Sequence, residues 1–446
     1  MHIFPQLRKA ERKYANELVV IGVHSAKFAR EKLSESIHDA AERYGIQHPI
    51  VNDRDFRVWQ SYAVRAWPTL MFLDPLGHVI GTHSGELPFE ALDRLLGDMV
   101  AEFDSKGMLD RRPLPIGAQT GYMSASGLVF PGKVLADAAT QRIYIADSSH
   151  NRIVIGDLEG NVRDVIGSGA AGQRDGGYDE AQFHWPQGMA LVGDALYVAD
   201  CENHLVRRID LDAHRVETVA GTGEQARGPM GAGAGRQVAL NSPWDLTVLD
   251  DIIYIAMAGS HQVWAYSLAD RTVRPHAGSG AEGIQDGPLV TAWLAQPCGI
   301  TSDGARLYIA DSESSAVRAI DTGRGGCVET IVGTDLFAFG DEDGSGDAVL
   351  LQHPLAVLFY NNMLYVADTY NNKIKLCGVG TRSVTSWAGT GERGHADGPV
   401  AQATFDEPSG LSEALGRIYV ADTNNHAIRV VDLETNDVSI LELRGL

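Results

Sequence analysis

Cysteine is scarce in this sequence, and none occurs in the first 200 residues. The four that are present, Cys201, Cys298, Cys327 and Cys377, have the spacing of neither a zinc motif nor a redox pair. Isolated thiols of this kind are typical of small buried hydrophobic side chains in a reducing compartment. We therefore expect a cytoplasmic protein, and no residue pattern indicates a cofactor.

Long apolar runs and an excess of basic charge are also missing. No run of about 18 apolar residues occurs, and the longest apolar stretches, such as residues 18–23, have the length of a strand. The start lacks the apolar core of a signal peptide. Residues 116–446 hold 42 acidic and 22 basic side chains. Because this balance repels phosphate backbones, we expect neither a nucleic acid nor a membrane as partner.

Repetition is the strongest feature that the sequence does have. The length of 446 residues favours two domains. A pentad with a central tyrosine recurs six times, at tyrosine-to-tyrosine distances of 53, 57, 54, 57 and 54 residues. Its β-branched and aromatic composition predicts a strand. The six copies are residues 143–147, 196–200, 253–257, 307–311, 364–368 and 418–422.

Each pentad belongs to a longer unit. A proline precedes the pentad, a tight turn follows it, and Gly-rich connectors that often end in Asp-Gly separate the units. Within a unit the pattern predicts four short antiparallel strands, which is typical of a propeller blade. A single blade cannot bury its faces alone, so six blades are expected to close on themselves. We therefore predict an all-β six-bladed propeller over residues 126–446.

The unit resembles the NHL repeat, in which Pro-x-Gly is followed by Tyr-Val-Ala-Asp and a turn that contains Asn. The third and fourth copies show departures from this pattern. The third has Asp245 in place of the glycine and Met257 in place of the aspartate, and the fourth has Ser314 and Ser315 where other copies carry Asn. We expect altered hydrogen bonding in the turns of these two blades.

The first hundred residues alternate between helices and strands. Helices are predicted over residues 3–15, 28–44, 56–62 and 87–102, a buried strand over 18–23, a short strand over 49–52, and a hairpin over 66–81. This order is similar to an α/β thioredoxin-like domain without its opening strand, and Trp67-Pro68-Thr69 resembles the cis-proline site of that fold. We place this domain, incomplete at its N-terminus, in residues 1–104 and a linker in residues 105–125.

The resemblance extends to the whole chain, which is similar to the NHL repeat-containing protein 2 family and its bacterial members. Residues 23–28, 48–53, 66–69 and 83–86 carry this similarity. In that family a strand and a Cys-x-x-Cys motif run directly into Met-His-Ile, the first three residues of this chain. Either the reading frame starts late, which we favour, or the chain is a genuine truncation. Without the strand, neighbouring backbone groups lose their partners, so we expect the chain as written to aggregate.

Candidate site residues come mainly from the repeat. The pentad aspartates are expected to accept N–H groups of the turns that follow them, a structural role. Three turn histidines at equivalent places are a weaker candidate for a metal site, which needs three such ligands. His24 and Ser25 lack a visible acidic partner, and residues 340–347 lack the spacing of a calcium loop. The two repeat sets are Asp147, Asp200, Asp311, Asp368 and Asp422, and His204, His261 and His426.

Three functions remain open. The one we favour is a protein-interaction or scaffold role, in which a protein or peptide binds a face of the propeller. The second is a thiol-disulfide oxidoreductase whose Cys-x-x-Cys lies upstream of Met1, because the chain as written has no thiol in its thioredoxin-like part. The third is a metal-dependent lyase or hydrolase at the propeller axis.

Overall fold

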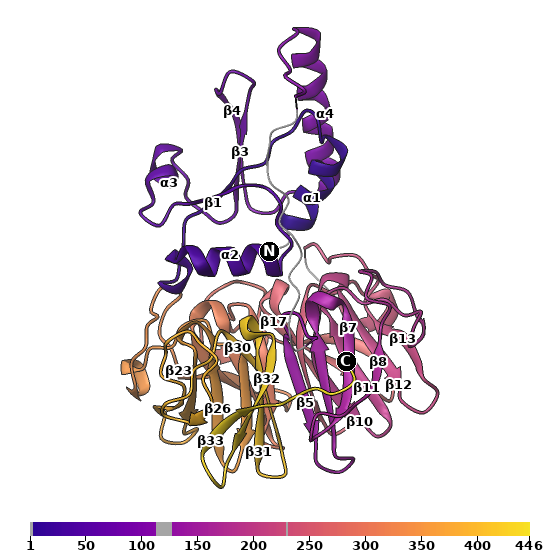
Figure 1. Ribbon diagram of the computed structural model, residues 1–446, viewed down its shortest axis with the longest axis vertical. Coiled ribbons are helices and arrows are strands. Elements are labelled where there is room, and N and C mark those ends of the chain that lie inside the picture. The colour runs from indigo at the N-terminus through magenta and orange to yellow at the C-terminus, as the bar shows by residue number, and fades with distance from the viewer. Residues whose placement is uncertain (1–2, 113–126, 229–230) are drawn as a thin grey trace. The chain divides into compact units, whose positions relative to one another are not determined.

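The computed structural model describes residues 3–112, 127–228 and 231–446 (Figure 1). The chain divides into two compact units, Met1–Tyr122 and Met123–Leu446. The first unit combines helices with short strands, and the second is built from strands and short 3₁₀ turns. None of the described helices is both long enough and apolar enough to cross a bilayer. The predicted linker over 105–125 lies outside the described residues from residue 113 onward.

The first unit contains two separate pairs of strands among its described residues. β1 and β2 are parallel, and β3 and β4 form the predicted antiparallel hairpin. Ala10 on the first helix and Tyr14 directly after it pack against Leu92 and Leu96 on the last helix. The elements are α1 (Ile3–Lys13), β1 (Gly22–His24), η1 (Arg30–Lys32), α2 (Ser34–Arg43), β2 (Ile50–Asn52), α3 (Arg57–Ser61), β3 (Thr69–Leu73), β4 (Val79–Ser84) and α4 (Phe89–Ser105).

The predicted buried strand over residues 18–23 is wrong in extent and in burial. Only Gly22–His24 pairs with a neighbour, and Val19, Ile21 and Val23 are exposed. The physical reason is the sheet topology of the described residues, in which β1 pairs with β2 alone and β3 with β4 alone. The predicted helix over 28–44 is likewise divided into η1 and α2.

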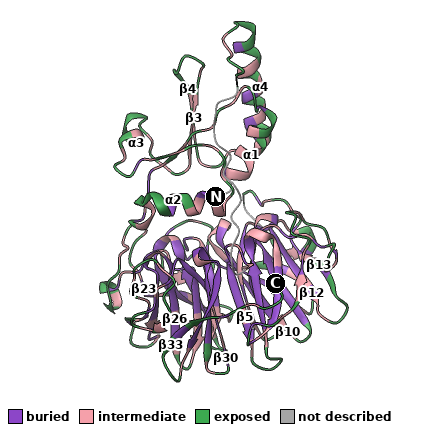
Figure 2. Ribbon diagram, in the orientation of Figure 1, coloured by how far each residue is buried: buried purple, intermediate pink, exposed green. Residues whose placement is uncertain are grey.

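The second unit is a six-bladed propeller, which confirms the prediction. Four antiparallel strands follow one another in each blade, and the first strands of adjacent blades contact one another around the axis. In blades 2 to 6 the connector adds a short fifth strand beside the fourth. Buried residues concentrate in these strands (Figure 2).

The strand bounds follow the six repeats. Blade 1 has β5 (Lys133–Asp137), β6 (Arg142–Asp147), β7 (Arg152–Asp157) and β8 (Val162–Ile166). Blade 2 has β9 (Gly176–Gly177), β10 (Pro186–Val192), β11 (Ala195–Asp200), β12 (Leu205–Asp210) and β13 (Arg215–Ala220). Blade 3 has β14 (Gly233–Ala234), β15 (Pro243–Leu249), β16 (Ile252–Met257), β17 (Gln262–Ser267) and β18 (Thr272–Ala277).

The second half of the ring has the same order. Blade 4 has β19 (Gly287–Pro288), β20 (Pro297–Ser302), β21 (Arg306–Asp311), β22 (Ala316–Asp321) and β23 (Cys327–Val332). Blade 5 has β24 (Gly344–Ser345), β25 (Ala356–Tyr360), β26 (Met363–Asp368), β27 (Lys373–Cys377) and β28 (Ser383–Ala388). Blade 6 has β29 (Gly398–Pro399), β30 (Pro408–Ala414), β31 (Arg417–Asp422), β32 (Ala427–Asp432) and β33 (Asp437–Ile440).

The last residues of the chain close the ring. Val162 in β8 donates its N–H to the Arg444 carbonyl at 2.9 Å, and Arg444 donates in return to the Gly160 carbonyl at 2.9 Å. Leu443 and Leu446 pack against the core shared by blades 1 and 6. The C-terminal segment thus pairs with the fourth strand of the blade that has no connector strand.

Candidate functional site

The pentad aspartates are fully buried and tie the second strand of a blade to the segment before its first strand. In each case one carboxylate oxygen accepts a backbone N–H that lies upstream, not in the following turn as predicted. The turn forms its own 3₁₀ bonds, such as His204 N to Cys201 O at 3.1 Å, so its N–H groups are already used. The donors and distances are Val129 to Asp147 at 2.8 Å, and His184 to Asp200, Ala295 to Asp311, Gln352 to Asp368 and Asp406 to Asp422 at 2.7 Å each.

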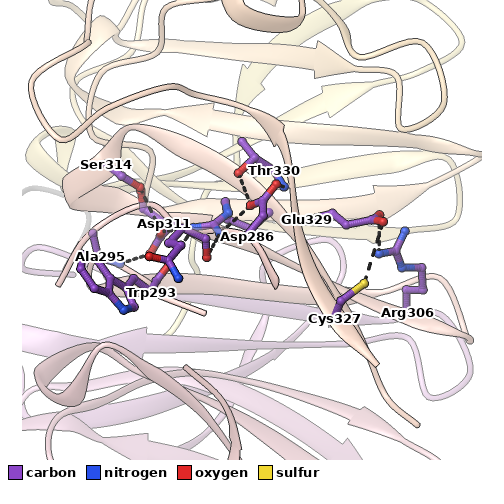
Figure 3. A network of polar contacts seen from close by, with 11 residues as sticks. Asp286, Trp293, Ala295, Arg306, Asp311, Ser314, Cys327, Glu329 and Thr330 are labelled. Atoms are coloured by element: carbon purple, nitrogen blue, oxygen red, sulfur yellow. Dashed lines mark hydrogen bonds and ion pairs between the residues drawn. The ribbon is translucent and has the colours of Figure 1, made fainter. Parts of the chain in front are cut away.

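The second carboxylate oxygen forms a buried ion pair with a cation on the third strand. In blade 2 the Arg207 guanidinium lies 2.8 Å from Asp200, and it also donates to Asp175 and to two connector carbonyls. Figure 3 shows the same network in blade 4, where Asp311, Asp286 and the Trp293 carbonyl converge. The other pairs are Arg152 with Asp147 at 2.8 Å, Arg318 with Asp311 at 3.3 Å, Lys375 with Asp368 at 3.4 Å and Arg429 with Asp422 at 3.1 Å.

Burial and the cation act in opposite directions on these carboxyl groups. Desolvation raises the pKa of Asp368 to about 6 and that of Asp422 to about 7, although Lys375 and Arg429 favour the charged forms. Every described hydrogen-bonding partner of these carboxylates belongs to the same blade or its connector. The set therefore acts as an internal support of the five blades that carry it.

Blade 3 has two apolar side chains in place of the ion pair, whereas its departure from the repeat had predicted only altered hydrogen bonding in the turn. Met257 and Trp264 occupy the aspartate and arginine positions, and both are fully buried. The upstream N–H, from Asn241, faces the Met257 sulfur at 3.4 Å, and the Trp264 indole donates to Gln262 at 2.9 Å. A buried ion pair and a well-packed apolar pair are alternative solutions to the same packing problem.

The three turn histidines join neighbouring blades. The residue that ends each 3₁₀ turn has a positive φ, and its side chain accepts the N–H of the residue before the next blade's proline. The ring Nδ1 is the acceptor for Ser242 at His204 (3.0 Å), Gln296 at His261 (3.3 Å) and Phe130 at His426 (3.0 Å). Asn151, Ser315 and Asn372 accept the equivalent N–H groups of Trp185, His353 and Glu407 at 3.0, 3.2 and 3.0 Å.

These bonds explain why histidine, asparagine and serine alternate at one position, since each supplies an acceptor at a similar reach. The three rings lie at three different blade interfaces, and the Nδ1 lone pair of each is in use. Within the part of the chain that the structure describes, no three His, Cys, Asp or Glu side chains are grouped to hold a metal ion.

A charged pair fills the propeller axis, and the sequence analysis did not identify it. Lys133 Nζ of blade 1 lies 3.1 Å from the Asp245 carboxylate of blade 3 and donates to the Leu355 carbonyl of blade 5 at 2.6 Å. Both side chains are largely buried, and burial raises the pKa of Asp245 while Lys133 opposes that shift.

The four other blades carry Gly or Ala at the register position of these two residues, namely Gly188, Gly299, Ala356 and Gly410. Only small residues leave room for the crossing side chains. A Cβ atom on Gly188 would lie 2.1 Å from an Asp245 oxygen. The departure of Asp245 from the repeat was therefore the signal of the axial pair, but its partner could not be assigned from the pattern.

The predicted cis-proline residues lie together in the first unit. The Trp67–Pro68 bond is cis, and Thr69 Oγ1 donates to the Ala66 carbonyl at 2.7 Å. The half-exposed Trp67 ring donates to the Ser25 carbonyl at 2.8 Å and packs on Trp59 with ring centroids 4.5 Å apart. This arrangement presents an aromatic surface, and no thiol accompanies it because residues 1–200 contain no cysteine.

His24 and Ser25 do not form a catalytic pair. The Ser25 hydroxyl donates to the buried Asp53 carboxylate at 2.9 Å, and Asp53 also accepts the Trp59 N–H at 2.9 Å. The His24 Nε2 atom is buried without a hydrogen-bond partner, and burial lowers the pKa of its ring. Asp53 therefore supports the start of α3 and positions Ser25. A histidine acting as general base would need to contact the hydroxyl, and in the described residues the His24 Nε2 does not.

Comparison with known proteins supports the sequence-based resemblance. Residues 183–209 and 405–431, which include the pentads and turns of blades 2 and 6, match the NHL repeat family. Human NHL repeat-containing protein 2 is 40% identical, and the alignment covers 99% of this chain and 66% of that protein. The chain belongs to the NHL repeat-containing protein 2 family.

Other similar proteins are longer or more distant. The chloroplastic protein SUPPRESSOR OF QUENCHING 1 of Arabidopsis thaliana is 43% identical over 100% of this chain and 44% of its own length. The chain thus spans about two thirds of the human relative and less than half of the plant one. Among solved structures, a chain of the nidogen/laminin complex is similar with 13% identity, 67% of this chain and 90% of that chain covered, and a TM-score of 0.45.

Proposed function

We propose that the protein is a scaffold whose propeller binds a protein partner or peptide. The observation that carries this proposal is the internal use of the chemistry-bearing side chains. The pentad aspartates pair with cations of their own blade, and the turn histidines accept a backbone N–H of the next blade. Lys133 and Asp245 fill the axis. A rigid closed ring of this kind offers its outer surfaces for binding, and function then depends on the side chains that those surfaces carry.

Reconstitution tests the scaffold proposal. The full chain, tagged and returned to its organism of origin, is purified with its associated proteins after mild cross-linking. Each associated protein is then produced separately and mixed with the full chain on a sizing column. We expect at least one partner to co-elute in a fixed ratio. Failure of every separately purified candidate to co-elute would contradict the scaffold role.

A second candidate function rests on the first unit, which we infer to be thioredoxin-like. The order of its elements supports this, as does the Trp67-Pro68-Thr69 sequence that leads into β3. The single pairing of β1 and of β3 is consistent with a place for one more strand between them. The activity would be thiol-disulfide exchange, in which a Cys-x-x-Cys dithiol is oxidised as a substrate disulfide is reduced.

That activity requires cysteines upstream of Met1, so the test compares two chains. The chain as written and a chain extended upstream in the gene are assayed for reduction of insulin disulfides and for thermal stability. We expect activity and higher stability only in the extended chain. Equal stability of the two chains would contradict the place for a further strand, and an inactive extended chain would contradict the redox role.

The third candidate, a metal-dependent lyase or hydrolase at the axis, has no observation in its favour. The Lys133 ammonium group occupies the axis beside Asp245, and a cation at that place would be repelled by it. Elemental analysis of the purified protein provides the direct check. A stoichiometric metal would return this candidate to consideration.

We also propose a reducing compartment, such as the cytoplasm. All four cysteines are unpaired, and Cys201, Cys298 and Cys377 are buried. Buried thiols of this kind persist where glutathione keeps thiols reduced. Fractionation of cells that produce the protein, followed by immunodetection, tests the location.

A further inference from the structure

The connector that leads into blade 4 exposes two large apolar side chains. Val290 is 74% exposed and Trp293 is 41% exposed. Large exposed apolar residues are few in the described part of the propeller, where the others are Phe337, Leu415 and Ile440. An exposed tryptophan next to an exposed branched side chain therefore stands out from the rest of this acidic surface.

The same connector backbone recurs in blades 2 and 6, which provide an internal comparison. In blade 4 the Ala292 N–H bonds to the Pro288 carbonyl at 3.0 Å, and Ala181 and Ala403 make the equivalent bonds at 2.9 and 3.0 Å. The buried arginine of each blade donates to the carbonyl one residue after this alanine, at 3.1 Å for Trp293. The equivalent acceptors are the carbonyls of Gln182 and Thr404. Residues 290 and 293 therefore correspond to 179 and 182 and to 401 and 404.

The side chains at these two positions differ although the backbone is shared. Blade 2 has Asp179 and Gln182, and blade 6 has Ala401 and Thr404. The inward residues Leu289 and Ala292 of blade 4 already fill the core, as the equivalent residues do in the other blades. Packing within the blade thus does not require Val290 or Trp293. The two positions are three residues apart and lie on either side of the Ala292 N–H that bonds to the Pro288 carbonyl.

The surroundings of Trp293 are acidic. Its ring lies against Gly283, where a Cβ atom would approach it to 2.9 Å, and the bridges Gln285–Trp293 and Glu282–Leu294 hold both connector segments side by side. Residues 280–296 include Glu282 and Asp286 but no Lys, Arg or His. Arg318, which donates to the Trp293 carbonyl, is fully buried and is already paired with Asp286 and Asp311.

We propose that residues 282–293 form a docking surface for a partner segment in which an apolar side chain is flanked by lysine or arginine. This inference deepens the scaffold role proposed above and rests on it. Tryptophan is enriched among the residues that dominate binding energy in interfaces. The acidic rim selects a cationic partner by complementary charge and accelerates its encounter. Val290 and Trp293 supply the apolar anchor. Glu282 supplies negative charge, and so does Asp286, whose side chain is 51% exposed although it also pairs with Arg318.

The internal repeats provide the test variants. Val290→Asp with Trp293→Gln installs the residues of blade 2, and Val290→Ala with Trp293→Thr installs those of blade 6. Both pairs are already compatible with this backbone, and the Arg318 bond to the carbonyl of residue 293 is retained. The matched control, Gln182→Ala in blade 2, changes the equivalent surface of another blade. Circular dichroism and thermal unfolding confirm that each variant folds.

The probe is a phage-displayed library of random peptides, selected on the immobilised full chain. We expect the wild type and the Gln182→Ala control to enrich peptides with an apolar residue between basic ones. Synthetic versions of these peptides should bind the wild type about tenfold or more tightly than either double variant, as measured by fluorescence anisotropy. Affinity should fall as salt increases, because the rim is charged.

Three outcomes would overturn the inference. They are equal affinity of the enriched peptides for the wild type and both double variants, enrichment of acidic peptides, and a wild type that enriches no peptide family. The first two leave the scaffold proposal intact, because the protein still binds peptides at another surface. The third overturns the docking surface but not the scaffold proposal, provided that co-purified partners still co-elute with the full chain. Only loss of that co-elution contradicts the scaffold proposal.

Discussion

Met257 and Trp264 in blade 3 occupy the same positions as Asp200 and Arg207 in blade 2, and all four side chains are fully buried. The two blades therefore solve one packing problem with opposite chemistries. In blade 2 the carboxylate and the guanidinium are 2.8 Å apart. Wherever the carboxylate is present a cation of the same blade pairs with it, because a lone buried charge would have no compensating partner.

This relationship predicts a coupling between two substitutions in blade 3. Met257→Asp alone and Trp264→Arg alone should each lower the stability of the propeller by about 3 kcal/mol, because each buries an unpaired charge. The double variant should lose less than the sum of the two. Differential scanning calorimetry of the four proteins measures the propeller transition in each. Additive losses would show that the two positions do not interact.

Substitutions of Lys133 and Asp245 at the axis should also be coupled in their effects on stability, although the two residues lie in different blades. Lys133→Met leaves Asp245 buried without its cation and should cost about 3–5 kcal/mol. Adding Asp245→Gly, the residue of the common repeat, should recover part of the loss because the unpaired carboxylate is removed. Chemical unfolding followed by tryptophan fluorescence reports both changes. A Lys133→Met protein as stable as the wild type would mean that the ion pair does not hold the axis.

The hydrogen bonds between neighbouring blades predict that position 204 needs a hydrogen-bond acceptor but does not need an imidazole ring. His204→Asn keeps an acceptor of the kind that Asn151 and Asn372 supply, so the melting temperature should stay close to that of the wild type. His204→Ala leaves the Ser242 N–H unpaired and should cost about 1–3 kcal/mol. Thermal unfolding of the two variants separates the two effects. Equal losses would indicate that the imidazole itself is required.

Burial predicts which thiols react. Desolvation raises the pKa of Cys298 and of Cys377 to about 12, so almost none of either thiol is ionised at pH 8. Since the thiolate is the nucleophile, both should resist iodoacetamide in the folded protein. Cys327 is half-buried, and the adjacent Asp321 carboxylate raises its pKa, so it should react slowly. Mass spectrometry before and after unfolding in guanidinium gives the count of labelled thiols, and rapid native labelling of Cys298 or Cys377 would contradict the buried positions.

The propeller could be predicted from the sequence because repetition multiplies a weak signal. One pentad such as residues 196–200 is compatible with any strand, whereas six copies at similar spacing leave few alternatives. The turn positions were also correctly aligned, which placed His204, His261 and His426 at equivalent sites. What each residue contacts could not be predicted, since those contacts depend on the neighbouring blade or on strands that are far apart in the chain. Lys133 and Asp245 are 112 residues apart and meet only when the ring closes.

The strands of the first unit could be predicted less well from the sequence, because they do not repeat. The apolar run over residues 18–23 has the composition of a buried strand, but composition does not specify which strand pairs with its edges. In the described residues β1 has one partner, and Val19 and Ile21 are exposed. The upstream donors of the pentad aspartates were missed for a related reason, because a local turn rule considers only the residues that follow.

The pairing of Arg444 with Gly160 and Val162 sets a condition on the order of events during synthesis. A ribosome completes blades 1 to 5 before blade 6 exists, and the first strand of blade 1 has no neighbour on one side until β30 appears. The final pairing needs residue 444. The nascent ring is therefore open until this residue has left the exit tunnel, however much of blades 1 to 6 has already been made.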